Sequence, residues 1–392
     1  MSKINVAVIQ LNAVKSNLNA QKAYLNTSLN KKYLDRFNIE KIKQEQISRM
    51  CEIIRSCATR GVNFIIFPEL ALTSFFPYFH FEDETTLNKY FEKGNITKGV
   101  AREMFMLAKK LNIALGFGYA ELTSENKKYN TYIIYDVLGR IHKYRKVHIP
   151  GFSKPSPNKP LFQFEKGIFF SSNEGYPVFR VALKINNKIV KVKTGITICH
   201  DRRYSAPYLS MGMKGAQIII NGYNTPKSLS FQKSLDDFVY RFHYLPLQAQ
   251  AITEGVYILS SGRTGNNFGI EQIAGSCIVS PFGELVSKSE NEKEEILFSS
   301  LDLDACNEVK AQKYWGDRSR YDLLLSEMVS HLGLSIALSS IKDKFTYEDI
   351  ISSFALHFSN EIKSQERQED YFIEDWKYDA NTSFYISKAI EE

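Results

Sequence analysis

Short segments rich in β-branched and aromatic residues alternate with longer amphipathic segments up to about residue 304. Short runs of this kind fit strands, and longer runs with apolar residues three and four positions apart fit helices. Strands separated by helices indicate an α/β domain, because the helices must cover the faces of a sheet. The pattern predicts strands at residues 5–10, 63–67, 113–119, 131–136, 193–198, 217–221, 256–260, 275–280 and 296–301.

The segments between and after these strands predict the remaining organisation. Apolar residues from Ile39 to Ile54 share one helical face, and Gly61 is a suitable stop for that helix. Ser280-Pro-Phe-Gly283 is typical of a turn between two strands. Strand patterns cease after Asp304, whereas residues 321–334 have helical spacing. We therefore expect a main domain at residues 1–329 and a C-terminal extension, largely helical, at residues 330–392.

Composition argues against several classes of protein. No apolar run approaches the roughly 18–20 residues of a membrane span, and the N-terminus lacks a signal-peptide pattern. The five cysteines are scattered without a Cys-x-x-Cys pair, which disfavours a disulfide framework and a structural zinc site. The net charge is +7, but basic and acidic residues are interspersed. We expect a cytoplasmic protein with no membrane or nucleic-acid partner, no metal and no cofactor.

Three chemically distinctive side chains stand where strands end or loops begin. Glu69 follows the apolar run Phe-Ile-Ile-Phe-Pro, Lys146 precedes a proline-containing loop, and Cys199 ends the run Thr-Gly-Ile-Thr-Ile. Taken singly, each residue is more typical of a structural position. The carboxyl ends of strands in parallel sheets, however, are where catalytic groups gather, so the three side chains are candidates for one site.

This combination suits acyl transfer from an amide. A thiol needs a base to become a nucleophilic thiolate, and a desolvated carboxylate can serve as that base. An ammonium group can stabilise the developing oxyanion, together with backbone N–H groups that follow the cysteine. Glu69, Lys146 and Cys199 would supply these three functions.

Three ordered motifs resemble the nitrilase, or carbon–nitrogen hydrolase, superfamily. They are Phe-Pro-Glu-Leu-Ala-Leu-Thr-Ser-Phe-Phe-Pro at residues 67–77, Tyr-Arg-Lys-Val-His-Ile-Pro-Gly at 144–151 and Ile-Cys-His-Asp-Arg-Arg at 198–203. The last run and residues 211–226 are most similar to the N-carbamoyl-D-amino-acid amidohydrolase branch. The resemblance covers about residues 4–325.

The resemblance implies a four-layer α-β-β-α sandwich, usually assembled into a homodimer or larger homo-oligomer through its outer helices. It implies Glu69 as general base, Lys146 as oxyanion stabiliser and Cys199 as nucleophile. A second glutamate of the family corresponds to Glu165, which would orient the lysine. The residues implied for substrate binding, including binding of a substrate carboxylate, are Arg202, Arg203, Asn224, Thr225 and His200.

The substrate-facing residues depart from that branch. His200 replaces the usual Asn, residues 204–206 are Tyr-Ser-Ala instead of Trp-Pro-Glu, and Gln163 stands where a His is common. The leading hypothesis is a cysteine-dependent amidohydrolase for an N-carbamoyl amino acid or a similar carboxylate-bearing amide, with a thioester-like intermediate. The alternatives are an amide synthase or acyltransferase on the same scaffold and a non-catalytic binding protein.

Overall fold

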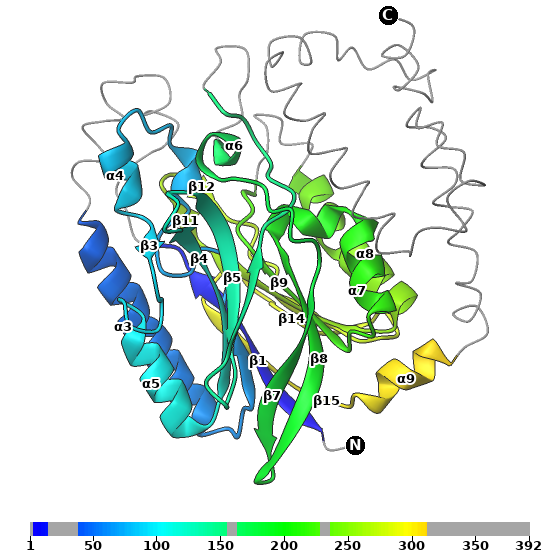
Figure 1. The fold of residues 1–392 in the computed structure, drawn as a ribbon. Coiled ribbons are helices and arrows are strands. Elements are labelled where there is room, and N and C mark those ends of the chain that lie inside the picture. The colour runs from blue at the N-terminus through cyan, green and yellow to red at the C-terminus, as the bar shows by residue number, and fades with distance from the viewer. Residues whose placement is uncertain (1–2, 15–37, 155–162, 228–235, 312–392) are drawn as a thin grey trace, which may run out of the picture. The chain divides into compact units, whose positions relative to one another are not determined.

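The computed structural model describes residues 3–14, 38–154, 163–227 and 236–311 (Figure 1). Its main strands form two sheets. The first sheet contains β15 (Glu295–Leu301), β1 (Ile4–Asn12), β2 (Phe64–Ile66), β4 (Ala114–Leu122), β5 (Lys128–Tyr135) and β6 (Ile141–Arg145), with the short β3 (Glu92–Lys93) beside β4. The second contains β14 (Leu285–Lys288), β13 (Cys277–Val279), β10 (Tyr257–Thr264), β9 (Ile218–Tyr223), β8 (Lys188–Ile198) and β7 (Val178–Ile185).

The two sheets are joined at the carboxyl ends of β1 and β10, where Leu11 pairs with Arg263 and Asn12 with Thr264. This junction is parallel, as are the pairings of β1 with β2, β10 with β9 and β9 with β8. The carboxyl ends of β2, β8 and β9 therefore point the same way. Residues that follow strands in different sheets can consequently meet at one end of the molecule.

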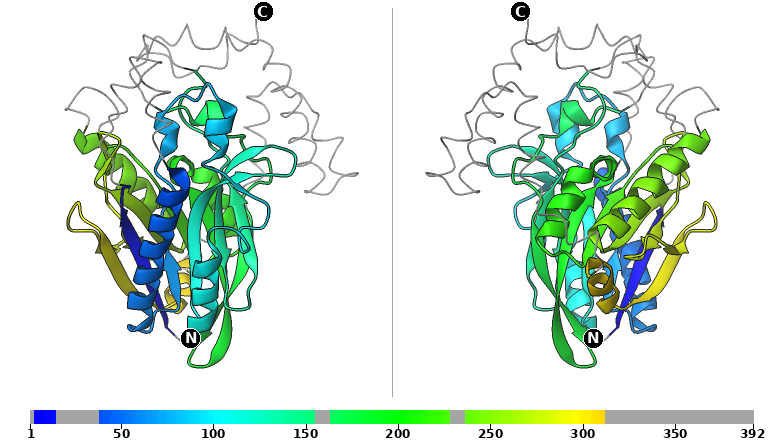
Figure 2. Two further views of the ribbon diagram at one scale, coloured as in Figure 1. Left: turned by 90° about the vertical axis from the view of Figure 1, so that its left-hand side faces the viewer. Right: turned by 90° about the vertical axis from the view of Figure 1, so that its right-hand side faces the viewer.

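Alternating side chains make four layers. On β1, Val6 and Val8 face a core shared with the second sheet, whereas Ala7 and Ile9 face a separate core beneath the helices. That outer core is completed by α3 (Ile39–Ala58) and α5 (Arg102–Leu111). A third core lies between the second sheet, α7 (Ser205–Met213) and α8 (Asp236–Glu254). Figure 2 shows each helix pair on its own outer face, so the expected α-β-β-α sandwich is confirmed.

Local sequence signals account for the boundaries of α3. The Asn38 side chain accepts a hydrogen bond from the Lys41 N–H at 3.0 Å and so caps the first turn. The helix ends at Ala58. Gly61, the predicted stop, follows with a φ of +67°, a left-handed conformation that glycine adopts without strain. The remaining short elements are η1 (Phe76–Tyr78), α4 (Glu84–Asn88), α6 (Glu165–Ile168), η2 (Cys199–Arg203), β11 (Asn266–Asn267), β12 (Ile270–Glu271) and α9 (Asp304–Lys310).

All nine predicted strands are present, and the predicted turn joins β13 to β14 through a Gly283 N–H bond to the Ser280 carbonyl. The sequence pattern did not predict β6, β7 and β14, nor the two-residue strands β3, β11 and β12. On β6 only Tyr144 is buried, so the strand lacks a continuous apolar face. The predicted helix at 321–334 and the extension at 330–392 lie outside the described residues, so the 329/330 boundary stays a prediction. Within the described part of the chain, no helix is long and apolar enough to cross a membrane.

Candidate active site

Both sheets contribute side chains to one buried polar cluster. From the first sheet come Glu69, just after β2, and Lys146, which directly follows β6. The second sheet supplies Cys199 after β8 and Asn224 after β9. The structure therefore brings together the three catalytic candidates predicted from the sequence.

The Glu69 carboxylate is held on both oxygens. Its Oε1 accepts hydrogen bonds from Lys146 Nζ at 3.0 Å and Asn130 Nδ2 at 2.7 Å. Its Oε2 accepts one from the Asn224 N–H at 2.8 Å, and the Asn224 side chain donates to the Glu69 carbonyl at 2.8 Å. Glu69 has no solvent-exposed surface. A buried carboxylate with this many donors has one fixed orientation, as a positioned proton acceptor requires.

Two glycines allow the Glu69 backbone to approach the sheets. A Cβ at Gly118 on β4 would lie 2.7 Å from the Glu69 Cα, and a Cβ at Gly222 on β9 would lie 2.9 Å from the Glu69 nitrogen. Any side chain at either position would displace the residue from its place between the sheets. The glycines thus set the location of the carboxylate.

Lys146 bridges two buried carboxylates. Its ammonium donates to Glu165 Oε2 at 2.6 Å and to Glu69 Oε1 at 3.0 Å. Burial by itself lowers the pKa of Lys146, but the charges of Glu165 and Glu69 outweigh it and raise the pKa above its ordinary value. Lys146 therefore remains a cation at neutral pH.

Glu165 is itself fixed by the side chain of Gln163. The Gln163 amide donates to Glu165 Oε1 at 2.7 Å while Lys146 occupies Oε2. Burial and the charge of Glu69 raise the pKa of Glu165 above its ordinary value, although the charge and hydrogen bond of Lys146 and the amide of Gln163 oppose that rise. The predicted orienting contact between Glu165 and Lys146 is present in the structure.

Cys199 occupies a strained turn at the end of β8. Its φ of +46° lies in the left-handed region that non-glycine residues rarely adopt, and such strain is common at functional sites. The Sγ lies 3.2 Å from the Asn224 carbonyl and 3.6 Å from Arg202 Nη1. Burial and the charge of Glu69 raise the pKa of the Cys199 thiol, while Lys146 and Arg202 lower it. The net rise keeps the resting sulfur protonated, so attack requires a base.

Asp201 holds this turn in place. Its Oδ2 accepts from the Ile198 N–H at 2.9 Å and from the Tyr144 hydroxyl at 2.8 Å. Its Oδ1 accepts from the His148 N–H and contacts His148 Nδ1, both at 2.9 Å. The His148 ring stacks on Tyr204 with centroids 3.9 Å apart. His148 thus contacts the cysteine turn through Asp201.

The two adjacent arginines have different surroundings. Arg202 is buried and donates to the Cys199 carbonyl at 2.7 Å and the Thr225 hydroxyl at 2.8 Å. Arg203 lies over the Phe242 ring at 4.1 Å and donates to the Phe242 carbonyl on α8. Neither forms an ion pair with a carboxylate of the described residues. Burial and the charge of Arg202 lower the pKa of Arg203 to about 9.

His200 is an uncharged neighbour of these arginines. Burial and the charges of Lys146, Arg202 and Arg203 lower its pKa to about 3. Its Nε2 lies 3.2 Å from the Tyr204 hydroxyl. His200 and Tyr204, two of the positions that depart from the N-carbamoyl branch, therefore contact one another beside the cysteine.

Asn130 and Asp201 also belong to the site, although neither was predicted from the sequence. Asn130 lies inside β5, where a buried amide among apolar residues is an unusual choice and is the one signal that marks it. Asp201 follows Cys199 closely, but nothing in the sequence shows which backbone groups its carboxylate reaches. Both act on catalytic candidates through hydrogen bonds that only the folded chain creates.

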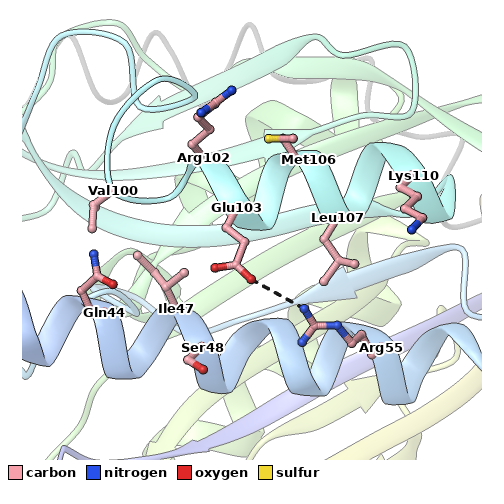
Figure 3. Close-up of a pocket in the computed structure, with 10 residues that line it drawn as sticks. All are labelled: Gln44, Ile47, Ser48, Arg55, Val100, Arg102, Glu103, Met106, Leu107 and Lys110. Carbon is pink, nitrogen blue, oxygen red and sulfur yellow. Dashed lines mark ion pairs between the residues drawn. The ribbon is translucent and has the colours of Figure 1, made fainter.

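Two further features of the described structure bear on function. The residues that it describes contain no group of three or more His, Cys, Asp or Glu side chains arranged to hold a metal ion. Figure 3 shows a surface groove between α3 and α5, with Ile47 and Leu107 among its lining residues and an Arg55–Glu103 ion pair at 3.6 Å. That groove includes none of the predicted site residues.

Sequence comparison identifies relatives along most of the described chain. Residues 6–311 match the family model for carbon-nitrogen hydrolase. A deaminated glutathione amidase from Dictyostelium discoideum is 28% identical over 269 residues, covering 67% of this chain and 84% of that protein. The human omega-amidase NIT2 is 26% identical over 298 residues, covering 75% of this chain and 96% of that protein.

Solved structures agree on the fold. A carbon-nitrogen hydrolase from Helicobacter pylori G27 superposes with a TM-score of 0.63 at 20% identity, covering 82% of this chain and 96% of that one. Saccharomyces cerevisiae Nit3, a nitrilase-superfamily member, gives a TM-score of 0.58 at 20% identity, covering 81% and 97%. Since the family match extends over more than half of the sequence, this chain belongs to the carbon–nitrogen hydrolase family, the nitrilase superfamily.

Proposed function

We propose that the protein is an amidase that hydrolyses a small carboxylate-bearing amide through a thioester on Cys199. The observation that carries the proposal is the buried chain of Glu165, Lys146 and Glu69 beside a strained cysteine. Such a chain supplies a fixed base and a permanent cation without a metal ion. Glu69 acts as the base and acid, Lys146 stabilises the oxyanion, and Glu165 orients the lysine.

The first half-reaction forms the thioester and releases the amine. Glu69 takes the proton from the Cys199 thiol as sulfur attacks the amide carbon, and the carbonyl oxygen becomes an oxyanion near the Lys146 ammonium. When the tetrahedral intermediate collapses, the C–N bond breaks and Glu69 returns its proton to the departing nitrogen. Ammonia or an amine leaves, and the acyl group remains on Cys199.

The second half-reaction consumes water. Glu69 removes a proton from a water molecule that attacks the thioester, and Lys146 again stabilises the oxyanion. Collapse breaks the C–S bond and releases the carboxylic acid, while sulfur regains the proton from Glu69. The Glu69 carboxylate therefore accepts a proton twice in each turnover, first from the thiol and then from water.

A substrate carboxylate would match the cationic side of the site. Arg202 and Arg203 lie three and four residues after the nucleophile and pair with no acid among the described residues. A guanidinium left without a carboxylate in a buried region favours an anionic ligand. Asn224 and Thr225 lie beside the same cysteine and would complete this part of the substrate site.

Two kinds of amide meet this description. The sequence resemblance favours N-carbamoyl amino acids, whereas the relatives cited above are named for omega-amides and deaminated glutathione. A panel of both, with simple amides and nitriles as further members, should be scored for ammonia release. We expect activity on carboxylate-bearing amides, and ammonia release from none of the panel would contradict the proposal.

The same thioester could pass its acyl group to an amine. Adding hydroxylamine or a primary amine to the reaction distinguishes transfer from hydrolysis, because transfer yields the corresponding hydroxamate or amide at the expense of free acid. Hydrolysis to free acid as the main path without added nucleophile is the expected result. Dominant amide formation at low amine concentration would favour an acyltransferase instead.

We further infer that the chain forms at least a homodimer through an outer helix layer. The α7–α8 layer exposes several large apolar side chains, among them Met213, Phe242 and Leu245. Exposed apolar side chains gathered on one helical face are typical of an interface. Light scattering should give a mass of at least twice 45.0 kDa. A monomer at micromolar concentration would contradict this inference.

A further inference from the structure

A buried arginine outside the predicted triad contacts the loop that follows Glu69. Arg263 lies on β10 at the junction of the two sheets, opposite Leu11 of β1, and none of its surface is exposed. No ion pair links it to an acid among the described residues. Burial lowers its pKa to about 10, so it remains a cation at neutral pH.

The guanidinium instead donates to carbonyl oxygens of the Glu69 loop. Its Nη2 lies 3.1 Å from the Leu70 carbonyl, 3.0 Å from that of Ala71 and 2.5 Å from that of Thr73. Three of the four residues that follow Glu69 are thus tied to one nitrogen. Leu70 has a φ of +46°, a conformation that needs outside support to persist.

The other terminal nitrogen anchors the guanidinium to the surrounding framework. Nη1 donates to the Asn12 carbonyl at 2.9 Å and lies 3.4 Å from Gln46 Oε1 on α3. Arg263 therefore connects the end of β1, the first outer helix and the Glu69 loop. A lysine could keep the charge but has a single nitrogen, so it could not reach both groups of acceptors.

We propose that Arg263 is a positioning residue for the general base. By fixing the carbonyls of Leu70, Ala71 and Thr73, it fixes the backbone direction from which the Glu69 carboxylate projects toward Lys146 and Cys199. The proposal rests on the proposed role of Glu69 as base. Arg263 touches no reacting atom and acts only through the loop.

The test compares Arg263→Lys, which keeps the charge, with Lys43→Met, a substitution of a buried basic residue elsewhere. Lys43 lies on α3, is almost fully buried and pairs with Glu92 at 2.7 Å. Each variant is made in the wild-type chain and in Glu69→Gln. The readouts are kcat, KM, melting temperature and the rate of Cys199 alkylation by iodoacetamide, located by peptide mass spectrometry because other cysteines are present.

We expect Arg263→Lys to lower kcat and the alkylation rate about 10- to 100-fold, as a displacement near 1 Å of a catalytic group does. KM should change less than about threefold, since the substrate contacts are untouched. In the Glu69→Gln background the same change should have almost no further effect on alkylation, because it acts through the missing carboxylate. Lys43→Met should lower the melting temperature while leaving kcat within about threefold.

Several outcomes would overturn the inference. One is a folded Arg263→Lys enzyme with wild-type kcat, and another is a loss of equal size with and without the Glu69 carboxylate. If Glu69→Gln alone leaves turnover and alkylation unchanged, the proposed function fails first. If Arg263→Lys does not fold, Gln46→Leu serves in its place, because it removes one hydrogen-bond acceptor of the guanidinium. An alkylation rate of Cys199 that is unchanged in Gln46→Leu would also contradict the proposal.

Discussion

Replacing Glu165 with Gln tests whether Glu165 maintains the charge and orientation of Lys146. The substitution keeps the shape of the side chain but removes the charge that lies 2.6 Å from Lys146 Nζ. Glu69, at 3.0 Å, would then be the one carboxylate left on the ammonium. A hydrogen bond to a charged group contributes about 1.5–3 kcal/mol. We therefore expect kcat/KM to fall about 10- to 100-fold, since about 1.4 kcal/mol corresponds to a factor of ten.

The pH dependence of Glu165→Gln distinguishes this role of Glu165 more clearly than the size of the loss in kcat/KM does. The pKa of Lys146 is raised because Glu165 and Glu69 outweigh the effect of burial. Without the Glu165 charge, burial remains and the pKa of Lys146 falls. Activity that needs the ammonium is present below that pKa and is lost as pH rises through it. The variant should thus lose activity at an alkaline pH where the wild type retains it.

The assay is ammonia release measured from pH 6 to 10, with the melting temperature followed at each pH. Glu174→Gln is the matched control, because Glu174 is an exposed carboxylate that pairs with Arg145 and makes no contact with Lys146 Nζ. The control should behave as wild type. An unchanged kcat/KM and an unchanged alkaline limb in Glu165→Gln would refute the view that Glu165 maintains the charge of Lys146.

Four further substitutions test neighbouring parts of the site. Lys146→Ala should lower kcat about 10²- to 10³-fold in single-turnover assays, because loss of one oxyanion donor costs roughly 3–4 kcal/mol; wild-type turnover would remove Lys146 from the mechanism. Gln163→Leu removes the amide that lowers the pKa of Glu165, so this pKa should rise further and the acid limb of the pH–rate profile should move to higher pH. An acid limb at the wild-type position would count against a role for this contact. Arg202→Lys and Arg203→Lys should raise KM more than they lower kcat, and the wild type should prefer a free-acid substrate to its methyl ester; equal kcat/KM for acid and ester would show that no carboxylate is recognised.

The fold was largely predictable because its strands are buried on both faces. Residues 217–221 and 256–260, for instance, lie between a helix layer and the other sheet, so they appear as continuous apolar runs. The strands that sequence analysis missed are those without such a run. On β7, Arg180 is exposed, and β14 alternates half-buried with exposed residues.

The catalytic candidates were predictable for a different reason. Glu69 and Cys199 stand at the ends of apolar strands, where a charged or reactive side chain contrasts with what precedes it. Their partners give no such contrast. Gln163 and Arg263 are polar residues in mixed segments. Gln163 donates to Glu165, two residues later, and Arg263 donates to carbonyls of the Glu69 loop far away in the sequence, so their importance emerges only in the folded chain.

The two adjacent arginines show that a sequence motif does not reveal the direction of each side chain. Two adjacent guanidinium groups suggest one fork-shaped clamp, but successive side chains diverge in the turn after Cys199. Arg202 turns inward to the Cys199 carbonyl and Thr225, whereas Arg203 lies against Phe242 of α8. Of the two, the structure leaves Arg203 nearer to the surface. Separate substitutions of Arg202 and Arg203 by Lys are therefore more informative than a double variant, because the two side chains have different contacts.

The most direct test of covalent catalysis is to detect the acyl-enzyme itself. The wild-type enzyme is mixed with a substrate amide, quenched in acid within one turnover and digested for peptide mass spectrometry. We predict that the peptide containing Cys199 gains the mass of the acyl group. The Cys199→Ala variant should gain none, keep its circular dichroism spectrum and lose turnover by several orders of magnitude. Near-normal turnover of Cys199→Ala, or acylation at another residue, would contradict this prediction.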